Sequence, residues 1–304
     1  MGKNSHSKTT TGLVAVLMIV LFYYLQKDVE RQIDKLILEQ ETTGSAYANQ
    51  PLPPCPKSKY EGGTFHSQYY EDYILSYVFN DVTKGVFLDI GAAHPTRNNM
   101  TYLFYQKGWR GISIDPIPAY QKLYDEKRSG DLFINIGVSE TESTLTFFHC
   151  GHQCELGTFD KEIAEFHKQN GGIHFNEMQI PVRPISQVLK AHPKKHIHFA
   201  NVDVEGWEQS VLKSFDFKNQ RPEIFVIEST KPKSEAPNFK NWEPTLISNG
   251  YMFAMTDYLN RYYVDLSSPN LTSYLQRLNY IDMCVRHSKI EKNTRPTSWD
   301  TDLR

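Results

Sequence analysis

The sequence lacks an excess of charge of either sign: its 304 residues carry 33 Lys and Arg against 35 Asp and Glu, for a formal net charge of −2. Because no run of Lys or Arg is present either, we expect no nucleic acid or other bulk electrostatic partner. No segment repeats at the spacing of a solenoid protein. With 39% hydrophobic and 22% charged residues, the composition indicates an ordinary globular protein with one sizeable core.

Cysteine is also scarce, with four residues at Cys55, Cys150, Cys154 and Cys284. An even number fits two disulfides in an oxidising compartment, whereas four free thiols would fit a reducing one. The segment 149–154 holds four side chains of the types that bind zinc, but they are too close in sequence for a comfortable tetrahedron. We therefore predict no metal site and favour a local Cys150–Cys154 disulfide, with Cys55–Cys284 as the second.

Only one long apolar run is present, at residues 12–25. The uncharged stretch 9–25 is close to the lower limit of about 17 residues for a membrane-spanning helix. A cleaved signal peptide needs small residues soon after the run, and Ala46 and Ala48 are too distant. A buried core helix is the other alternative, but the run is remote from the rest of the domain. We predict a short tail over 1–8 and a single-pass membrane anchor over 9–25.

The segment after the predicted anchor has a helical pattern. Residues 26–41 place Val29, Ile33, Leu36 and Ile37 on one face, which predicts a helical stem. The stem could join two chains into a homodimer or lie on the membrane. Residues 42–59 are rich in Pro, Ser, Thr and Gly and predict a linker. A folded domain over 60–290 and a tail over 291–304 complete the layout of a type II membrane protein of the Golgi or endoplasmic reticulum.

Short β-branched and aromatic runs alternate with helix-like segments after position 84. The expected strands are nearly all apolar, as in strands covered on both faces, and lie at 86–90, 111–114, 132–136, 197–202 and 224–227. The expected helices lie at 99–107, 119–127, 208–214 and 242–249. This alternation predicts an α/β fold with a mostly parallel sheet and helices on both faces. Residues 251–253 and 262–264 are expected to add an antiparallel edge.

A glycine or an acidic residue follows each expected strand: Gly91, Asp115, Gly137, Asp203 and Glu228. Because the carboxyl ends of parallel strands meet at one edge of a sheet, these residues predict an acidic, glycine-lined crevice. Neither GxGxxG nor GxxxxGK[ST] is present, and the stretch after the first strand reads HPTRNNMT. A positively charged nucleoside without phosphates therefore fits the crevice better than a dinucleotide.

Four blocks of the sequence together resemble the FkbM family of methyltransferases; they are Ser67–Asp72, Phe87–Tyr120, Ile134–Glu140 and Val202–Glu228. The resemblance implies a Rossmann-like methyltransferase fold, S-adenosylmethionine as the methyl donor, and O-methylation, often of sugar hydroxyls. Combined with the anchor, it predicts an O-methyltransferase that acts on a glycan. The alternative is a catalytically inactive, methyltransferase-like membrane protein in trafficking or cargo binding, which degraded cofactor residues would favour.

The resemblance also implies roles for individual residues. The cofactor would be bound by Gln68, Glu71, Asp89, Gly91, Ala92, Asp115, Asn135, Gly137 and Asp203. The candidates for a catalytic base are Asp203, Glu205 and His94, in that order. Glu205 is equally explained as a helix amino-terminal residue, and His94 as a packing residue in a loop. The polar loop 151–180 is predicted to be a lid over the acceptor.

Overall fold

The computed structural model describes residues 65–151, 154–194, 196–230, 237–257 and 259–287. None of the helices in these ranges is both long and apolar enough to cross a bilayer. The predicted anchor, stem, linker and carboxyl-terminal tail lie outside the described residues, as does Cys55.

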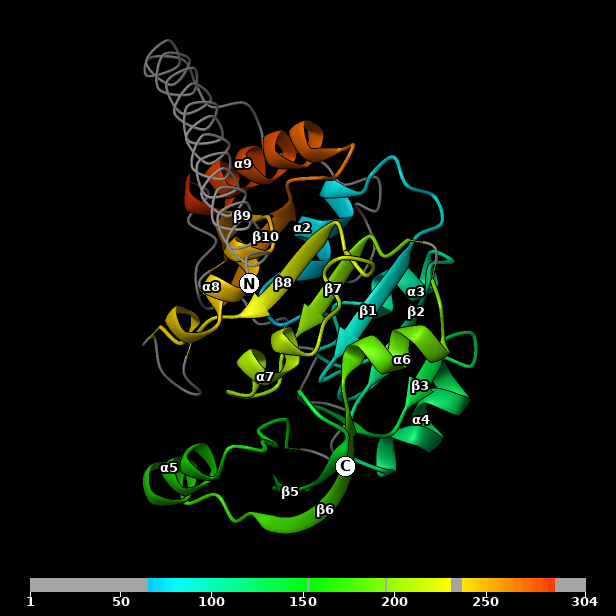
Figure 1. The fold of residues 1–304 in the computed structure, drawn as a ribbon. Coiled ribbons are helices and arrows are strands. Elements are labelled where there is room, and N and C mark those ends of the chain that lie inside the picture. The colour runs from blue at the N-terminus through cyan, green and yellow to red at the C-terminus, as the bar shows by residue number, and fades with distance from the viewer. Residues whose placement is uncertain (1–64, 152–153, 195, 231–236, 258, 288–304) are drawn as a thin grey trace, which may run out of the picture. The chain divides into compact units, whose positions relative to one another are not determined.

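The fold is built on a seven-stranded sheet with the order β3-β2-β1-β7-β8-β10-β9 (Figure 1). The first five strands in this order run parallel, and the β8–β10 and β10–β9 pairs are antiparallel. The predicted α/β class with an antiparallel edge is therefore confirmed. The strands are β1 (Val86–Ile90), β2 (Arg110–Ile114), β3 (Leu132–Ile134), β7 (Phe199–Val202), β8 (Ile224–Glu228), β9 (Tyr251–Thr256) and β10 (Asn260–Asp265).

Helices cover both faces of this sheet because consecutive strand residues point to opposite sides and nearly all of them are apolar. Phe87 packs with α2 (Glu71–Val78), α3 (Tyr102–Gln106) and α9 (Leu271–His287). Its neighbour Leu88 packs on the other face. That face holds α6 (Ile185–Ala191), α7 (Glu208–Lys213) and α8 (Glu243–Ser248), which follows the 3-10 turn η1 (Phe239–Asn241). Helix α4 (Ala119–Lys127) packs beside β3.

A second, three-stranded sheet corrects the sequence-based expectation for residues 132–180. The expected strand 132–136 ends early, because Gly137 starts β4 (Gly137–Val138), which pairs with β6 (Asn176–Arg183). Strand β5 (Ser143–His149) pairs with the other edge of β6, and α5 (Lys161–Gly171) lies between them in sequence. The prediction that 151–180 is a loop was wrong, since Asp160 caps α5 by accepting from two backbone N–H groups.

The expected Cys150–Cys154 disulfide is present, with the two Cα atoms 5.5 Å apart. It closes a short turn directly after β5, and Phe148 pairs with Thr158 across the same turn. The turn therefore returns the chain toward the carboxyl ends of the main strands. Cys284 is buried on α9, while its predicted partner lies outside the described residues.

Candidate active site

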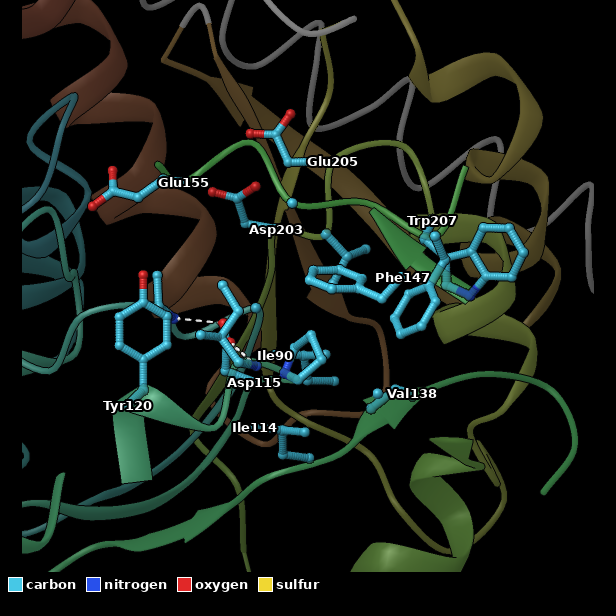
Figure 2. Close-up of a pocket in the computed structure, with 18 of the residues that line it drawn as sticks. Ile90, Ile114, Asp115, Tyr120, Val138, Phe147, Glu155, Asp203, Glu205 and Trp207 are labelled. Carbon is cyan, nitrogen blue, oxygen red and sulfur yellow. Dashed lines mark hydrogen bonds between the residues drawn. The ribbon is translucent and has the colours of Figure 1, made fainter. Parts of the chain in front are cut away.

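One pocket opens at the carboxyl ends of β1, β2, β4 and β7 (Figure 2). It contains about 570 Å³ of space free of protein atoms, including its open mouth. Strands β1 and β7 are neighbours at the point where the strand order reverses direction, which is where ligands bind in open α/β sheets. Of the predicted site residues, the wall includes Gly91, Asp115, Gly137, Asp203 and Glu205.

Gly91 makes the tight turn after β1. Its φ is +81°, in the left-handed region that favours glycine, and its N–H donates to the carbonyl of Ile114 at 2.9 Å. A Cβ atom at this position would collide with the backbone carbonyl of Asp203. The two strand ends can therefore lie this close together only because residue 91 has no side chain.

Asp115 ends β2 with its carboxylate held by backbone N–H groups. The Oδ2 atom accepts from the N–H of Ala93 at 2.9 Å, and Oδ1 accepts from the N–H of Ile117 at 2.8 Å. Burial raises the pKa of Asp115 to about 7, although these two hydrogen bonds lower it. Each oxygen keeps a second lone pair for a ligand hydroxyl. Asn135 donates to the main-chain carbonyl of Asp115 at 2.9 Å and so positions it.

Asp203 and Glu205 lie in the turn between β7 and α7. Burial, followed by the nearby carboxyl groups of Glu208, Glu71 and Glu155, raises the pKa of Asp203 to about 7. Glu205 adopts a left-handed φ of +51°. Its carbonyl accepts from Thr158 Oγ1 at 2.8 Å. The segment after β5 is thereby fastened to the turn that carries both acids.

Two further acids were not assigned to the site from the sequence. Glu155, just after the disulfide, lines the pocket and accepts from Asn98 Nδ2 at 2.9 Å. Glu228, the last residue of β8, has a carboxylate oxygen within 4.8 Å of one of Asp203. Figure 2 shows Asp203 between Glu155 and Glu205, with the rings of Phe147 and Trp207 farther to the right. The sequence marked Glu228 as a strand-end acid, but nothing local in the sequence indicated Glu155.

Several predicted cofactor residues do not line the pocket. Asp89 is buried and accepts from Thr101 Oγ1 at 2.7 Å and Asn201 Nδ2 at 3.0 Å, so it orders the strand ends from within. Glu71 accepts from Asn260 Nδ2 at 2.9 Å. The others lie outside the wall in different ways: Asn135 is half-buried behind Asp115, Ala92 is buried in the turn, and Gln68 is exposed.

His94 also lies outside the pocket wall. Its Nδ1 atom accepts from the backbone N–H groups of Thr96 and Arg97, both at 3.2 Å. Burial, together with the charges of Arg97 and Lys127, lowers the pKa of His94 to about 4. The imidazole is therefore neutral near pH 7 with its lone pair already used, an arrangement that caps the loop and does not serve a base.

Two groups of side chains in the described part of the chain are spaced closely enough to bind a metal ion. In His196, His198 and Glu223, the possible ligand atoms lie within 4.8 Å of one another. Yet His198 Nδ1 accepts from the N–H of Val86 at 3.1 Å, so the neutral ring carries its proton on Nε2. That is the wrong tautomer for a ligand whose second nitrogen should be a donor.

The second group is Asp203, Glu205 and Glu228, whose ligand oxygens also lie within 4.8 Å of one another. The carboxyl groups of Asp203 and Glu228 repel each other when both are ionised, and burial together with neighbouring carboxyl groups raises the pKa of each. The pair therefore favours a proton over two bare charges. We assign no metal ion to this group.

Comparison with models of known protein families identifies the family of this chain. The model of the methyltransferase FkbM domain matches residues 89–253, which is more than half of the 304-residue chain. The chain belongs to the FkbM methyltransferase family. The matched range begins at Asp89, near the end of β1, and ends in β9, so it includes every predicted residue that lines the pocket. With the seven-stranded sheet, the family establishes a Rossmann-like methyltransferase fold.

Other comparisons are more distant. The chain is similar to a crystal structure of methyltransferase FkbM from Methylobacillus flagellatus KT, with 14% sequence identity and a TM-score of 0.36. That match covers 60% of this chain and 44% of the other, so the chain spans less than half of that protein. A search of curated proteins gives no match.

Proposed function

We propose that the protein is an S-adenosylmethionine-dependent O-methyltransferase that acts on a sugar hydroxyl of a glycan. The methyltransferase class comes from the family. One observation carries the proposal further: Gly91, Asp115, Gly137 and Asp203, which follow or begin four different strands, line the same pocket. They are four of the nine residues for which the family pattern implies contact with the cofactor.

The charge of the pocket supports a cationic nucleoside as cofactor. Of the residues that the structure describes, its wall contains four carboxyl side chains, those of Asp115, Glu155, Asp203 and Glu205, and no Lys, Arg or His. A phosphate group would be repelled by this wall, whereas the sulfonium and ammonium groups of S-adenosylmethionine would be attracted. When bound, this cofactor supplies a methyl group that is already activated for transfer. Asp115 is available to accept from the ribose hydroxyls, as its free lone pairs permit.

Aromatic side chains beside the acids support a sugar as acceptor. The ring of Phe159 lies 4.8 Å from that of Phe147 and 5.9 Å from that of Trp207, measured between centroids. All three line the pocket. Such rings offer flat apolar surfaces against which the carbon face of a sugar ring can pack. The nearby carboxylates favour a neutral or amine-bearing sugar over an acidic one.

Asp203 is the residue we assign as base. It lines the pocket, and its pKa of about 7 is close to the value that suits proton transfer at neutral pH. The remaining work of this chain is to hold the acceptor oxygen in line with the methyl group and to exclude water, because placement contributes most to such a transfer.

Calorimetric titration of the full-length protein with S-adenosylmethionine tests the cofactor. We expect binding, and we expect Asp115→Asn to weaken it roughly 10-fold to 100-fold through loss of charged hydrogen bonds. Asp125→Asn is the matched control, because Asp125 is exposed on α4 and bonds to Gln121 at 2.9 Å. Absence of binding at millimolar ligand would reject the proposal and favour the non-catalytic trafficking alternative.

Incubation with radiolabelled S-adenosylmethionine and a glycan panel tests the acceptor. Neutral and amino sugars are expected to receive label, while sulfated and uronic sugars of similar size remain unlabelled. Stable ether linkage of the label, resistant to mild base, identifies O-methylation. Label found on nitrogen or on acidic sugars would contradict the acceptor class while leaving the cofactor intact.

We further propose that the domain lies on the luminal side of a Golgi or endoplasmic reticulum membrane. The disulfide at Cys150–Cys154 supports an oxidising compartment, and the uncharged stretch at residues 9–25 supports an anchor. Protease treatment of sealed microsomes checks this orientation. The domain should survive until detergent opens the vesicles, and digestion without detergent would contradict a luminal position.

A further inference from the structure

Two neighbouring parallel strands end in carboxyl groups that meet. Strand β7 pairs with β8 so that Val202 lies opposite Ile227, and the next residues along the chain are Asp203 and Glu228. The carboxylate oxygens of the two side chains lie within 4.8 Å of one another. Two ionised carboxylates this close in a buried position repel each other, so the pair favours a state that holds one proton.

The surroundings keep that proton in place. Glu228 is buried, and its register partner on β10 is Asn260, which donates to Glu71 at 2.9 Å. Burial and then the charge of Asp203 raise the pKa of Glu228 well above its ordinary value. Among the described residues, the other charged groups that contribute most to the pKa values of the pair are acids from α2, the segment after β5, the turn after β7 and α7: Glu71, Glu155, Glu205 and Glu208.

The two members of the pair differ in access. Asp203 is part of the pocket wall, whereas Glu228 is not. We infer that Glu228 is a positioning residue for methyl transfer: it holds one proton against Asp203 and leaves the other face of the Asp203 carboxylate to receive the proton of the acceptor hydroxyl. This inference rests on the proposed function.

The chemical step balances with this assignment. The hydroxyl oxygen of the acceptor forms a bond to the methyl carbon as the carbon–sulfur bond breaks and its electron pair goes to sulfur. The hydroxyl proton passes to Asp203. The pair then holds two protons and releases one to solvent before the next turnover. At low pH both carboxyl groups are protonated and the base is lost, so turnover should rise with pH around neutrality.

An infrared pH titration tests the shared proton without any acceptor or cofactor. At pH 8, the difference spectrum of the wild-type protein minus Glu228→Gln should contain the C=O band of a protonated carboxylic acid. The matched control is Glu223→Gln, at the other end of β8, whose difference spectrum should lack this band. Absence of the band for Glu228 would overturn the inference, and this result is independent of whether S-adenosylmethionine binds.

Kinetics on any acceptor found by the glycan panel test the role in transfer. Asp203→Asn should lower kcat by roughly 10²-fold to 10⁴-fold. Glu228→Ala removes the donor and should move the acid limb of the kcat profile up by about one pH unit. Glu228→Gln keeps a neutral donor and should restore most of the activity lost in Glu228→Ala.

A purely structural Glu228 would give a different pattern. Both substitutions would then lower kcat without moving the pH profile, and that result would overturn the inference. Calorimetry separates this failure from failure of the proposed function, because in the first case S-adenosylmethionine still binds the wild-type protein and in the second it does not.

Discussion

A buried glutamate lies at each end of strand β8, and the pKa values of the two side chains are shifted in opposite directions. Glu223 directly precedes the strand and is 3% exposed, and Glu228 ends it and is 7% exposed. The pKa of Glu223 lies below its ordinary value, whereas that of Glu228 lies well above. Two residues of one type, both buried, therefore have pKa values shifted in opposite directions.

The difference comes from the partners at each end. Burial by itself raises the pKa of Glu223, but donors surround its carboxylate and outweigh that effect. They are His196 Nε2 at 2.9 Å, Tyr274 OH at 2.8 Å, Ser268 Oγ at 2.9 Å and Asn270 Nδ2 at 3.1 Å. Glu228 faces carboxyl groups instead. At the amino end of β8, hydrogen-bond donors stabilise the ionised Glu223. At the carboxyl end, Glu228 lies among other carboxyl groups, and the resulting repulsion is unfavourable for folding but typical of reactive sites.

Of the changes that test this comparison, Glu223→Ala should alter the free energy of unfolding most. Removing the carboxylate leaves the buried Tyr274 hydroxyl and Ser268 without their acceptor, and we expect a loss of about 4 kcal/mol in the free energy of unfolding. Denaturant titration monitored by circular dichroism measures it. Glu223→Gln, which keeps one acceptor oxygen, should lose about half as much. A loss below about 1 kcal/mol for the alanine variant would show that solvent replaces the network.

The second-largest effect should be the change in the free energy of unfolding with pH. Burial raises the folded-state pKa of Asp115, Asp203, Glu208 and Asp257 to about 7 in each case. Since unfolded carboxyl groups titrate near 4, the folded state binds more protons between these values. The stability contributed by these groups is therefore complete below pH 4 and lost as pH rises through 7.

We expect the free energy of unfolding to fall by about 2 kcal/mol from pH 6 to pH 8.5, seen as a drop of several degrees in Tm. The double variant Asp203→Asn, Glu228→Gln should flatten part of this slope. A Tm that is constant or rises across this range would contradict the elevated pKa values at the carboxyl end of the sheet.

Glu228→Gln should have a smaller effect, of opposite sign to Glu223→Gln. At pH 8 the unfolded chain carries an ionised Glu228, so folding must take up a proton that Gln does not need. We expect a gain of about 1 kcal/mol at pH 8 that diminishes toward pH 5. Denaturant titration at both pH values checks it. Destabilisation at pH 8 would mean that Glu228, like Glu223, is ionised and well solvated by donors.

The smallest effect should come from His196→Ala. The His196 side chain is 46% exposed, and Glu223 keeps three other donors when it is removed. An exposed partner contributes little, so we expect a loss of about 0.5 kcal/mol. His192→Ala, at another exposed position, is the control for changes in surface composition. A loss as large as that of Glu223→Ala would place most of the network energy in this one ion pair.

Much of the main sheet could be predicted from local sequence. Strand β1 and helix α4 have the predicted bounds, Val86–Ile90 and Ala119–Lys127. Their signals are local, since an apolar run between polar turns fixes a buried strand and a 3.6-residue period fixes a helix. Helices α2, α6 and α9 were not predicted, because contacts with the rest of the fold stabilise them.

The three-stranded second sheet was not predicted from the sequence, for a related reason. Strand β4 is two residues long and pairs with Val182 and Arg183 of β6, more than forty residues along the chain. In β6, the residues buried deepest are Ile180 and Val182, and its other positions are exposed or partly exposed. Such a weak alternation resembles a polar loop when no partner strand is known.

For the candidate site, the sequence by itself determined which residues stand at the strand ends. Gly91, Asp115, Gly137 and Asp203 could be placed together because parallel strands bring their carboxyl ends to one edge. Only the tertiary structure decided that Glu155 and Trp207 join them, that His94 and Asp89 lie outside the wall, and that the carboxyl group of Glu228 lies near that of Asp203. The physical reason is range: strand ends follow from local pattern, whereas burial and the charges facing a carboxyl group depend on segments that meet only after folding.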